Sequence, residues 1–424
     1  MNIRLTVTAA ALLLFLAFIS SATALDLSGQ SRTYLQSRET TDSSRLLPFF
    51  EYLDFRADDV GSKAVSFHFG GWLRYDLREE SARNTRANSD LQYAYLRVRG
   101  EKTDADMDLG RVLVNEGVAS EQMDGAYVRA GLWGGFGVAA FGGSPVETTF
   151  DDRSGDSVYG GRISHSVPDI YRIGFSYLEE KNSKDDFRKE GGVDLWLRPF
   201  SKIELLGNSF YNSLTSAWML HSYYLTFGPF AGLRLSALGT EVSYGDYFTS
   251  STISAFKFDP AIIDPREKLS TAGGEAAYTF GGPVTISADY KQHSYDIAGD
   301  ADYFGGKVAW SAPKGGMGAA WHRMDGVTDK LRYDEYRAYV SGKFGKLDLT
   351  ADYFIVRYET AIDGIRDAYA AVLAGGFGFT KRARLAADVE YARNPFYKED
   401  VRGLVKLVYD FESAAPAPKG RKGK

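Results

Sequence analysis

The chain has 424 residues, no cysteine and a formal net charge of −5. The absence of cysteine excludes disulfides, covalent haem attachment, iron–sulfur clusters and Cys-based zinc sites. The mildly acidic balance gives no support to a role with nucleic acid.

The first predicted element is an export signal over residues 1–24. Arg4 supplies the positive charge, Ala9–Ile19 is apolar, and Ala22-Thr23-Ala24 has the small-residue pattern of a cleavage site. The apolar stretch is too short to span a bilayer as a helix. Export without cysteine favours a Gram-negative envelope, and we expect the mature chain in the outer membrane.

Residues 25–412 read as an all-β, transmembrane, antiparallel up-and-down barrel. Apolar and polar residues alternate along segments such as Val65–Leu77, Val284–Lys291, Leu347–Ile355 and Leu385–Tyr391. The chain has 27 Tyr, 27 Phe and 45 Gly, with a mean hydropathy of −0.27. Aromatic girdles, glycine turns and a polar interior account for this composition in a barrel whose apolar face meets lipid.

The connections alternate between tight and long. Tight turns are expected at Gly228-Pro229, Gly281–Pro283, Pro313–Gly315, Phe344–Lys346 and Thr380–Arg382, and upstream at Pro199–Lys202, Val167–Asp169, Trp133–Gly135, Gly100–Asp104 and Asp58–Ala64. Long outer loops are expected between them, including Asn115–Gln122, Glu180–Gly191 and Gly245–Ser270. This alternation predicts roughly 22 strands, with 20 as the alternative, and both termini in the periplasm.

A barrel of this size usually carries a plug, but only Leu25–Leu27 precede the first strand. We therefore predict that the chain has no plug domain. The long segment Gly245–Ser270, with its Asp-Pro turn formers, is the loop that could fold inward and narrow the pore.

Two sets of charges are predicted to face the lumen on different arcs of the barrel. The basic wall is Arg74, Arg97, Arg99, Arg111, Arg129 and Arg172, and the acidic wall is Asp289, Asp348, Asp352, Asp388 and Glu390. Opposed walls would create a transverse field that orients dipolar solutes or docks a partner with a patterned surface. The alternative is that these positions are simply wet and tolerate either sign of charge.

The last strand ends on outward-facing Val405, Leu407, Tyr409 and Phe411. Tyr409 and Phe411 resemble the C-terminal signal that the barrel assembly machinery recognises. Residues 413–424 are a low-complexity basic extension, expected to be a disordered periplasmic tail. Its alternative role is a tether to anionic lipid or to an acidic partner.

No catalytic or metal site is predicted, and the chain is not expected to be an enzyme. The five histidines show no metal-ligand spacing. Three of them precede a serine, as in His221-Ser222, but adjacent strand residues point to opposite faces. We expect no cofactor bound by this chain.

Four short segments carry two family resemblances. Leu109-Gly-Arg111 and Asp124-Gly-Ala-Tyr127 resemble hairpins of Gram-negative porins. Residues Ser28–Tyr34 and Val65–Trp72 are similar to the barrel component of porin–cytochrome conduits. That resemblance implies a sheath around a multihaem c-type cytochrome, with haem supplied only by partner cytochromes, and a role in extracellular electron transfer. The alternative is a self-standing diffusion porin for small hydrophilic solutes or ions.

Overall fold

The computed structural model describes residues 26–39, 44–78, 86–100, 103–146, 156–183, 185–248, 264–395 and 397–413. The predicted signal peptide, all of the predicted tail beyond Ser413 and the middle of the longest loop lie outside these ranges. Among the described residues, no helix is both long enough and apolar enough to cross a membrane.

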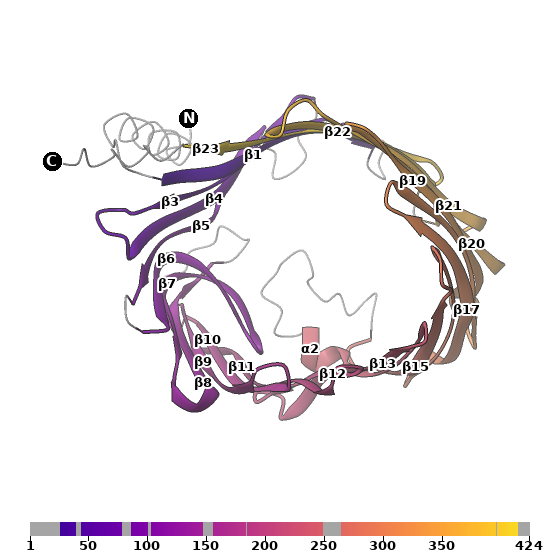
Figure 1. Cartoon of the computed structure of the whole chain (residues 1–424). Coiled ribbons are helices and arrows are strands. Elements are labelled where there is room, and N and C mark those ends of the chain that lie inside the picture. The colour runs from indigo at the N-terminus through magenta and orange to yellow at the C-terminus, as the bar shows by residue number, and fades with distance from the viewer. Residues whose placement is uncertain are drawn as a thin grey trace.

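The described chain is a series of antiparallel strands (Figure 1), and apart from the short β2 each strand pairs with the strands that precede and follow it around the barrel. The strands are β1 (Asp26–Glu39), β2 (Arg45–Leu46), β3 (Pro48–Asp58), β4 (Val65–Asp76), β5 (Ala87–Arg99), β6 (Ala105–Glu116), β7 (Ala119–Gly131), β8 (Phe136–Pro145), β9 (Ser157–Val167), β10 (Tyr171–Asn182), β11 (Asp185–Phe200), β12 (Ile203–Asn212), β13 (Ala217–Phe230), β14 (Leu233–Ser243), β15 (Lys268–Thr279), β16 (Val284–Tyr295), β17 (Gly299–Ala312), β18 (Gly315–Gly326), β19 (Arg332–Phe344), β20 (Leu347–Ile362), β21 (Ile365–Gly378), β22 (Ala383–Arg393) and β23 (Asp400–Glu412). Short helices are α2 (Tyr244–Phe248), η1 (Trp133–Gly135) and η3 (Asp329–Leu331).

The first and last long strands close the sheet into a barrel. β1 pairs with β23 from Ser28 opposite Glu412 to Ser37 opposite Gly403, and with β3 on its other side. β2 forms only a two-residue pairing with β1, so 22 of the 23 strands make the wall. The predicted fold class and the count of 22 are confirmed, and no helical plug is seen in the described part of the chain.

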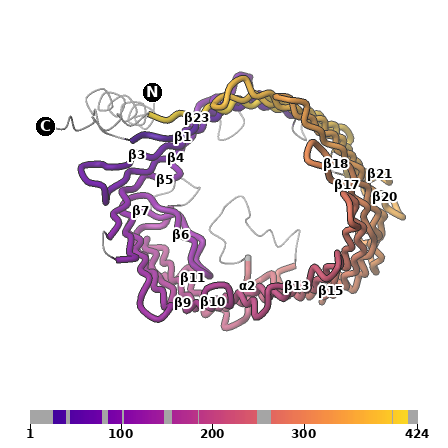
Figure 2. The backbone as a smooth tube through the Cα atoms, in the orientation of Figure 1, coloured from indigo at the N-terminus to yellow at the C-terminus, as the bar shows by residue number. Residues whose placement is uncertain are grey.

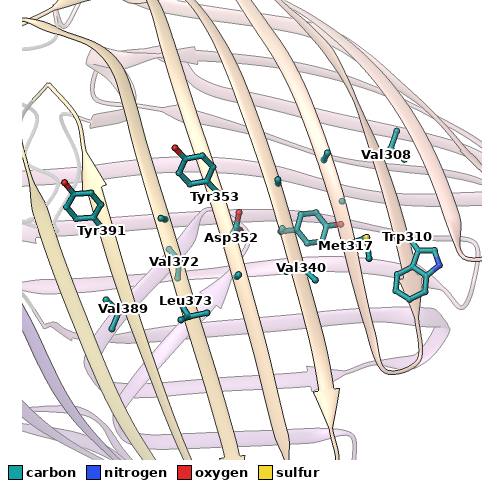
Figure 3. Close-up of a pocket in the computed structure, with 16 residues that line it drawn as sticks. Val308, Trp310, Met317, Val340, Asp352, Tyr353, Val372, Leu373, Val389 and Tyr391 are labelled. Atoms are coloured by element: carbon teal, nitrogen blue, oxygen red, sulfur yellow. The ribbon is translucent and has the colours of Figure 1, made fainter.

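The outward face is apolar, as the alternation predicts. Large apolar side chains project from it along β17–β22, including Trp310, Val340, Tyr353, Leu373 and Val389 (Figure 3). The register places these side chains next to one another across neighbouring strands, with Leu373 opposite both Ala351 and Val389. Because a membrane barrel keeps its nonpolar face outward, this surface is suited to lipid.

The predicted tight turns separate strands as expected, for example Ser201-Lys202 between β11 and β12 and Gly345-Lys346 between β19 and β20. Two predicted outer loops were wrong. The segment predicted as the loop Asn115–Gln122 forms strand ends joined by the two-residue turn Gly117-Val118, and Glu180–Gly191 is mostly paired strand of β10 and β11. Polar composition suggested loops there, but the polar side chains have partners inside the barrel.

Small residues allow aromatic rings to cover the closing seam. Gly29 of β1 lies between Phe411 of β23 and Phe55 of β3 in the ladder. A side chain at Gly29 would collide with the Phe411 ring and with Cβ of Phe55. Phe411 and the exposed Tyr409 thus share the outward face at the seam. Their role as an insertion signal stays a prediction.

The register makes a direct prediction about lipid contact. Val389 lies on the outward face with 55% of its surface exposed, whereas the adjacent Asp388 points to the lumen side. We expect Val389→Arg to destabilise the folded barrel by about 2–4 kcal/mol in lipid vesicles, and the matched Asp388→Arg to cost much less. Urea unfolding measures both values, and equal losses would contradict the assigned register.

Candidate functional site

The barrel wall is interrupted where the β6–β7 hairpin bends into the lumen (Figures 1 and 2). β5 pairs with β6 only between Ala94–Arg99 and Asp106–Arg111, while β6 and β7 continue to pair with each other up to Glu116 opposite Ala119. We call residues Val112–Met123, the part of the hairpin beyond this junction, the inner hairpin.

Apolar side chains hold the inner hairpin against the inside of the wall. Its contacts come from Val112, Val114, Val118, Ala119 and Met123, and the wall contributes Phe141, Val158, Leu178 and Phe210 from β8–β12, with Tyr127 completing the cluster. Met123 and Leu178 are fully buried. Since full burial of one such side chain contributes about 1.5–3 kcal/mol, the inner hairpin is a fixed part of the lumen.

The turn of the inner hairpin fits closely onto the wall. Gly117 has a φ of +61°, a left-handed conformation that favours glycine. The Val118 backbone N–H donates a buried hydrogen bond of 2.8 Å to the Ser176 hydroxyl of β10. Gly192 of β11 lies beneath the Val118 side chain, and any Cβ there would crowd it.

A buried charge cluster fixes the second strand of the inner hairpin. Glu121 forms an ion pair with Arg188 of β11, and the same guanidinium makes two hydrogen bonds to Glu190, of 2.8 and 3.0 Å. Glu180 of β10 lies 3.8 Å from it. All four groups are nearly inaccessible. One guanidinium therefore contacts three crowded carboxylates and joins the hairpin to two wall strands.

A second arginine connects the first strand of the inner hairpin to the wall. Arg162 of β9 lies 3.6 Å from Glu116 and makes hydrogen bonds of 2.5 and 2.9 Å to Asp194 of β11. Glu116 also accepts a hydrogen bond from Tyr127. A hollow of about 230 Å³ lies beside this junction, lined by tyrosines, paired charges and the exposed side of the hairpin: Tyr93, Tyr95, Arg97, Asp108, Leu113, Asn115, Glu116, Tyr127 and Arg129.

Where the hairpin leaves the wall, side chains of the hairpin donate hydrogen bonds to backbone carbonyls of β5 in place of the backbone pairing. Arg111 donates to the Leu91 carbonyl at 3.0 Å, and Gln122 donates to the carbonyls of Leu91 and Gln92. These bonds satisfy backbone acceptors that β6 no longer reaches. Arg111 also binds Asp124 through two hydrogen bonds of 2.7 and 2.8 Å. In the register it shares the outward face of β6 with Leu109, which differs from its predicted place in the basic wall.

Most of the predicted basic wall is paired with acids on the same arc. Arg97 binds Asp108 through two hydrogen bonds of 2.7 Å, and Arg129 binds Asp106 at 2.9 and 3.0 Å. Arg74 is buried, 3.5 Å from Asp76. Arg99 and Arg172 point to the lumen side and are exposed, without an ion pair among the described residues.

The predicted acidic wall is similarly mixed. Asp348 binds Arg384, Asp352 binds Arg337 and Asp289 lies 2.9 Å from His322. Asp388 and Glu390 lie on the lumen side of β22 without an ion pair among the described residues. The pairing of charges within each arc leaves a much weaker transverse field than two single-sign walls would give.

Nucleophile–base and metal chemistry find little support in the described residues. No group of three or more His, Asp or Glu side chains there could hold a metal ion. The Ser209 hydroxyl lies 2.8 Å from His221 Nδ1, across neighbouring strands. It is buried and also bonded to Tyr223, and the nearby Glu241 carboxylate binds Lys268 and Ser270 instead. We therefore interpret this cluster as structural.

The longest outer segment is anchored to β12 at its first described end. Asp246 of α2 accepts from Ser243 Oγ at 2.5 Å, and Asn212 of β12 donates to its backbone carbonyl at 3.2 Å. At the other end, hydrogen bonds from Arg266 lower the pKa of Asp264 to about 2, so this loop acid is ionised at neutral pH. The inward folding predicted for Gly245–Ser270 stays a prediction, because residues 249–263 lie outside the described residues.

No family model and no curated protein matches the sequence. The translocation pore of the P pilus usher (PapC) is similar in structure, with a TM-score of 0.51, 9% identity, and coverage of 92% of this chain and 100% of that chain. Two other structures match more loosely. OccK8 (OprE) of Pseudomonas aeruginosa has a TM-score of 0.43 and 11% identity, with coverage of 92% of this chain and 98% of that chain. OccAB4 of Acinetobacter baumannii has a TM-score of 0.45 and 8% identity, with coverage of 92% of this chain and 98% of that chain.

The likeness to the usher pore shows the fold alone, which is a closed 22-strand antiparallel β-barrel. At such low identities no residue role is transferred from the matched structures. The site therefore rests on the inner hairpin and on the charges that surround it.

Proposed function

We propose that this chain is a diffusion channel of the Gram-negative outer membrane for small hydrophilic solutes, narrowed by its own inner hairpin. The observation that carries the proposal is the hairpin itself, which occupies part of the lumen and is anchored there by an apolar cluster and by Arg188 and Arg162. A self-standing pore needs such a fixed constriction, because an open barrel of this width would let solutes leak freely.

The polar groups beside the hairpin suit hydrophilic solutes. Tyr93, Tyr95 and Tyr127 line the adjacent hollow together with paired Arg and Asp side chains. Paired charges and phenol hydroxyls present both donors and acceptors, and they carry little net charge. Such a lining favours small polar molecules over a strong selection for one sign of ion.

The sheath around a multihaem cytochrome remains the alternative proposal, motivated by the sequence resemblance of the first strands. A sheath needs a lumen free for a folded partner, and the inner hairpin reduces that space on the side of β8–β12. Haem would then belong entirely to the partner.

The test is to purify the barrel under native conditions and reconstitute it in planar bilayers. We expect a haem-free protein with a defined unitary conductance and ohmic behaviour. Co-purification of haem-staining proteins, together with loss of barrel stability when they are removed, would instead support the sheath.

A further inference from the structure

Strands β14–β19 lie across the lumen from the inner hairpin (Figure 1), and their inner face contains a recess. It has a volume of about 640 Å³ and is formed mainly by the inner face of β14–β19. Its floor includes the small, buried side chains of Ala277 and Ala309. Larger polar side chains surround this floor, so the recess is a concave polar surface beside the path of any solute.

The recess holds three cations, Arg234, Lys291 and Lys307, against two carboxylates, Glu275 and Asp289, so its formal charge is +1 with His322 neutral. Arg234 pairs with Glu275 at 3.3 Å, and Asp289 is bound to His322 at 2.9 Å. Lys307 and Lys291 have no ion pair within the described residues, and Lys291 lies 5.2 Å from the ring centre of Tyr303. Elsewhere in the described lumen, Arg99 and Arg172 also lack an ion pair, whereas acids pair with Arg97, Arg129, Arg162, Arg188, Arg337 and Arg384.

The remaining lining is rich in hydroxyl groups. Ser236, Thr285, Ser287 and Ser311 line the recess with Lys307. Ser287 lies directly opposite Lys307 in the ladder, and Tyr303 lies opposite Lys291. Tyr303 is held by a 2.8 Å hydrogen bond to Glu335 and by stacking on His322. The lysines thus project beside fixed donors and acceptors.

We infer that this recess is a binding station for a small organic oxyanion that also carries hydroxyl groups. The two ammonium groups supply the attraction for a carboxylate or phosphate, and the serine and threonine hydroxyls pair with hydroxyls of the solute. A channel needs binding that is strong enough to draw a solute in and weak enough to release it. The exposed Lys307 and the half-buried Lys291 meet both needs, because each is in contact with water and neither is held in an ion pair within the described residues. This inference rests on the proposed channel function and names its preferred solutes.

The experiment uses the full-length purified barrel and three probes: gluconate, glucose 6-phosphate and uncharged glucose. Calorimetry in detergent measures binding without requiring conduction, and solute-induced current noise in bilayers measures it during conduction. We expect both anions to bind more tightly than glucose. The variant Lys291→Gln/Lys307→Gln should weaken anion binding by about fivefold or more, since each charged contact at an exposed site is worth up to about 1 kcal/mol. Lys330→Gln, which removes the same charge from the loop at η3, should leave it unchanged.

The experiment distinguishes failure of the binding site from failure of the channel function. Binding of only one anion identifies the head group as carboxylate or phosphate and supports the inference. Equal binding of glucose and the anions, or no effect of the double variant on anion binding, overturns it even if the barrel conducts. A barrel that binds the anions through these lysines but does not conduct leaves the recess intact as a binding site and overturns the channel function.

Discussion

Removal of the inner hairpin is expected to raise the single-channel conductance severalfold. The proposed variant deletes residues 112–123 and joins Arg111 to Asp124 through Asn-Gly. Arg111 and Asp124 lie directly opposite each other in the ladder, and Asn-Gly closes such a pair with a two-residue turn. The barrel wall below this point keeps all its strand pairs, so the deletion widens the lumen without opening the sheet.

The matched control shortens a hairpin that extends from the wall of the opposite arc. Deleting residues 358–366 and joining Arg357 to Asp367 through Asn-Gly uses another directly opposed pair, on β20 and β21. Its conductance should stay close to that of the unmodified barrel. A second variant, Met123→Glu, keeps the length of the hairpin but places a charge in the fully buried contact with the wall. We expect it to increase current fluctuations. If both hairpin variants conduct like the parent, the hairpin does not limit the current.

The architecture was predictable from the sequence because every strand of a membrane barrel must meet the same requirement, an apolar face toward lipid. Alternate residues must face lipid, so apolar and polar residues alternate with a period of two in Val65–Leu77 and Leu385–Tyr391. This alternation does not depend on how the individual side chains pack. Strand number followed from turns such as Ser201-Lys202, whose position the structure reproduces. Closure between β1 and β23 followed from the even count.

The inner hairpin was not predicted, for a physical reason. Glu116, Glu121 and Gln122 look like loop residues, because their partners Arg162, Arg188 and the β5 carbonyls are distant in sequence. One local signal was present. Val112, Leu113 and Val114 are apolar at three successive positions, so both faces of the strand are apolar there. A barrel strand that faces lipid on one side and water on the other needs apolar residues only at alternate positions. Apolar lumen positions such as Leu178 and Phe210 would complete that signal.

The prediction of two single-sign charged walls did not foresee the ion pairs within each arc, for a related reason. The alternation shows which residues face the lumen, but not which neighbours they meet across the ladder. Arg97 opposes Asp108, and Asp352 opposes Tyr339 while binding Arg337 of the same neighbouring strand. Register fixes these pairs, and it is set by turn geometry and packing that the alternation does not encode.

Replacement of Arg188 by methionine is expected to release the inner hairpin. The guanidinium is surrounded by Glu121, Glu180 and Glu190, all almost fully buried. Loss of one partner from such a cluster costs about 3–5 kcal/mol, because the remaining charges stay desolvated without compensation. The hairpin can relieve the repulsion by moving Glu121 into water. Adding Glu121→Gln to the variant should therefore restore part of the closure.

The reporter for this release is a single introduced thiol. The chain has no cysteine, so Met123→Cys provides one probe at a position that is fully buried in the closed hairpin. In the Arg188→Met background we expect labelling by a water-soluble maleimide to accelerate by about two to three orders of magnitude, since each 1.4 kcal/mol changes an equilibrium tenfold. Arg384→Met is the control, because it removes an exposed pair with Asp348 whose loss costs at most about 1 kcal/mol. Equal labelling in both backgrounds would show that the apolar contacts alone hold the hairpin against the wall.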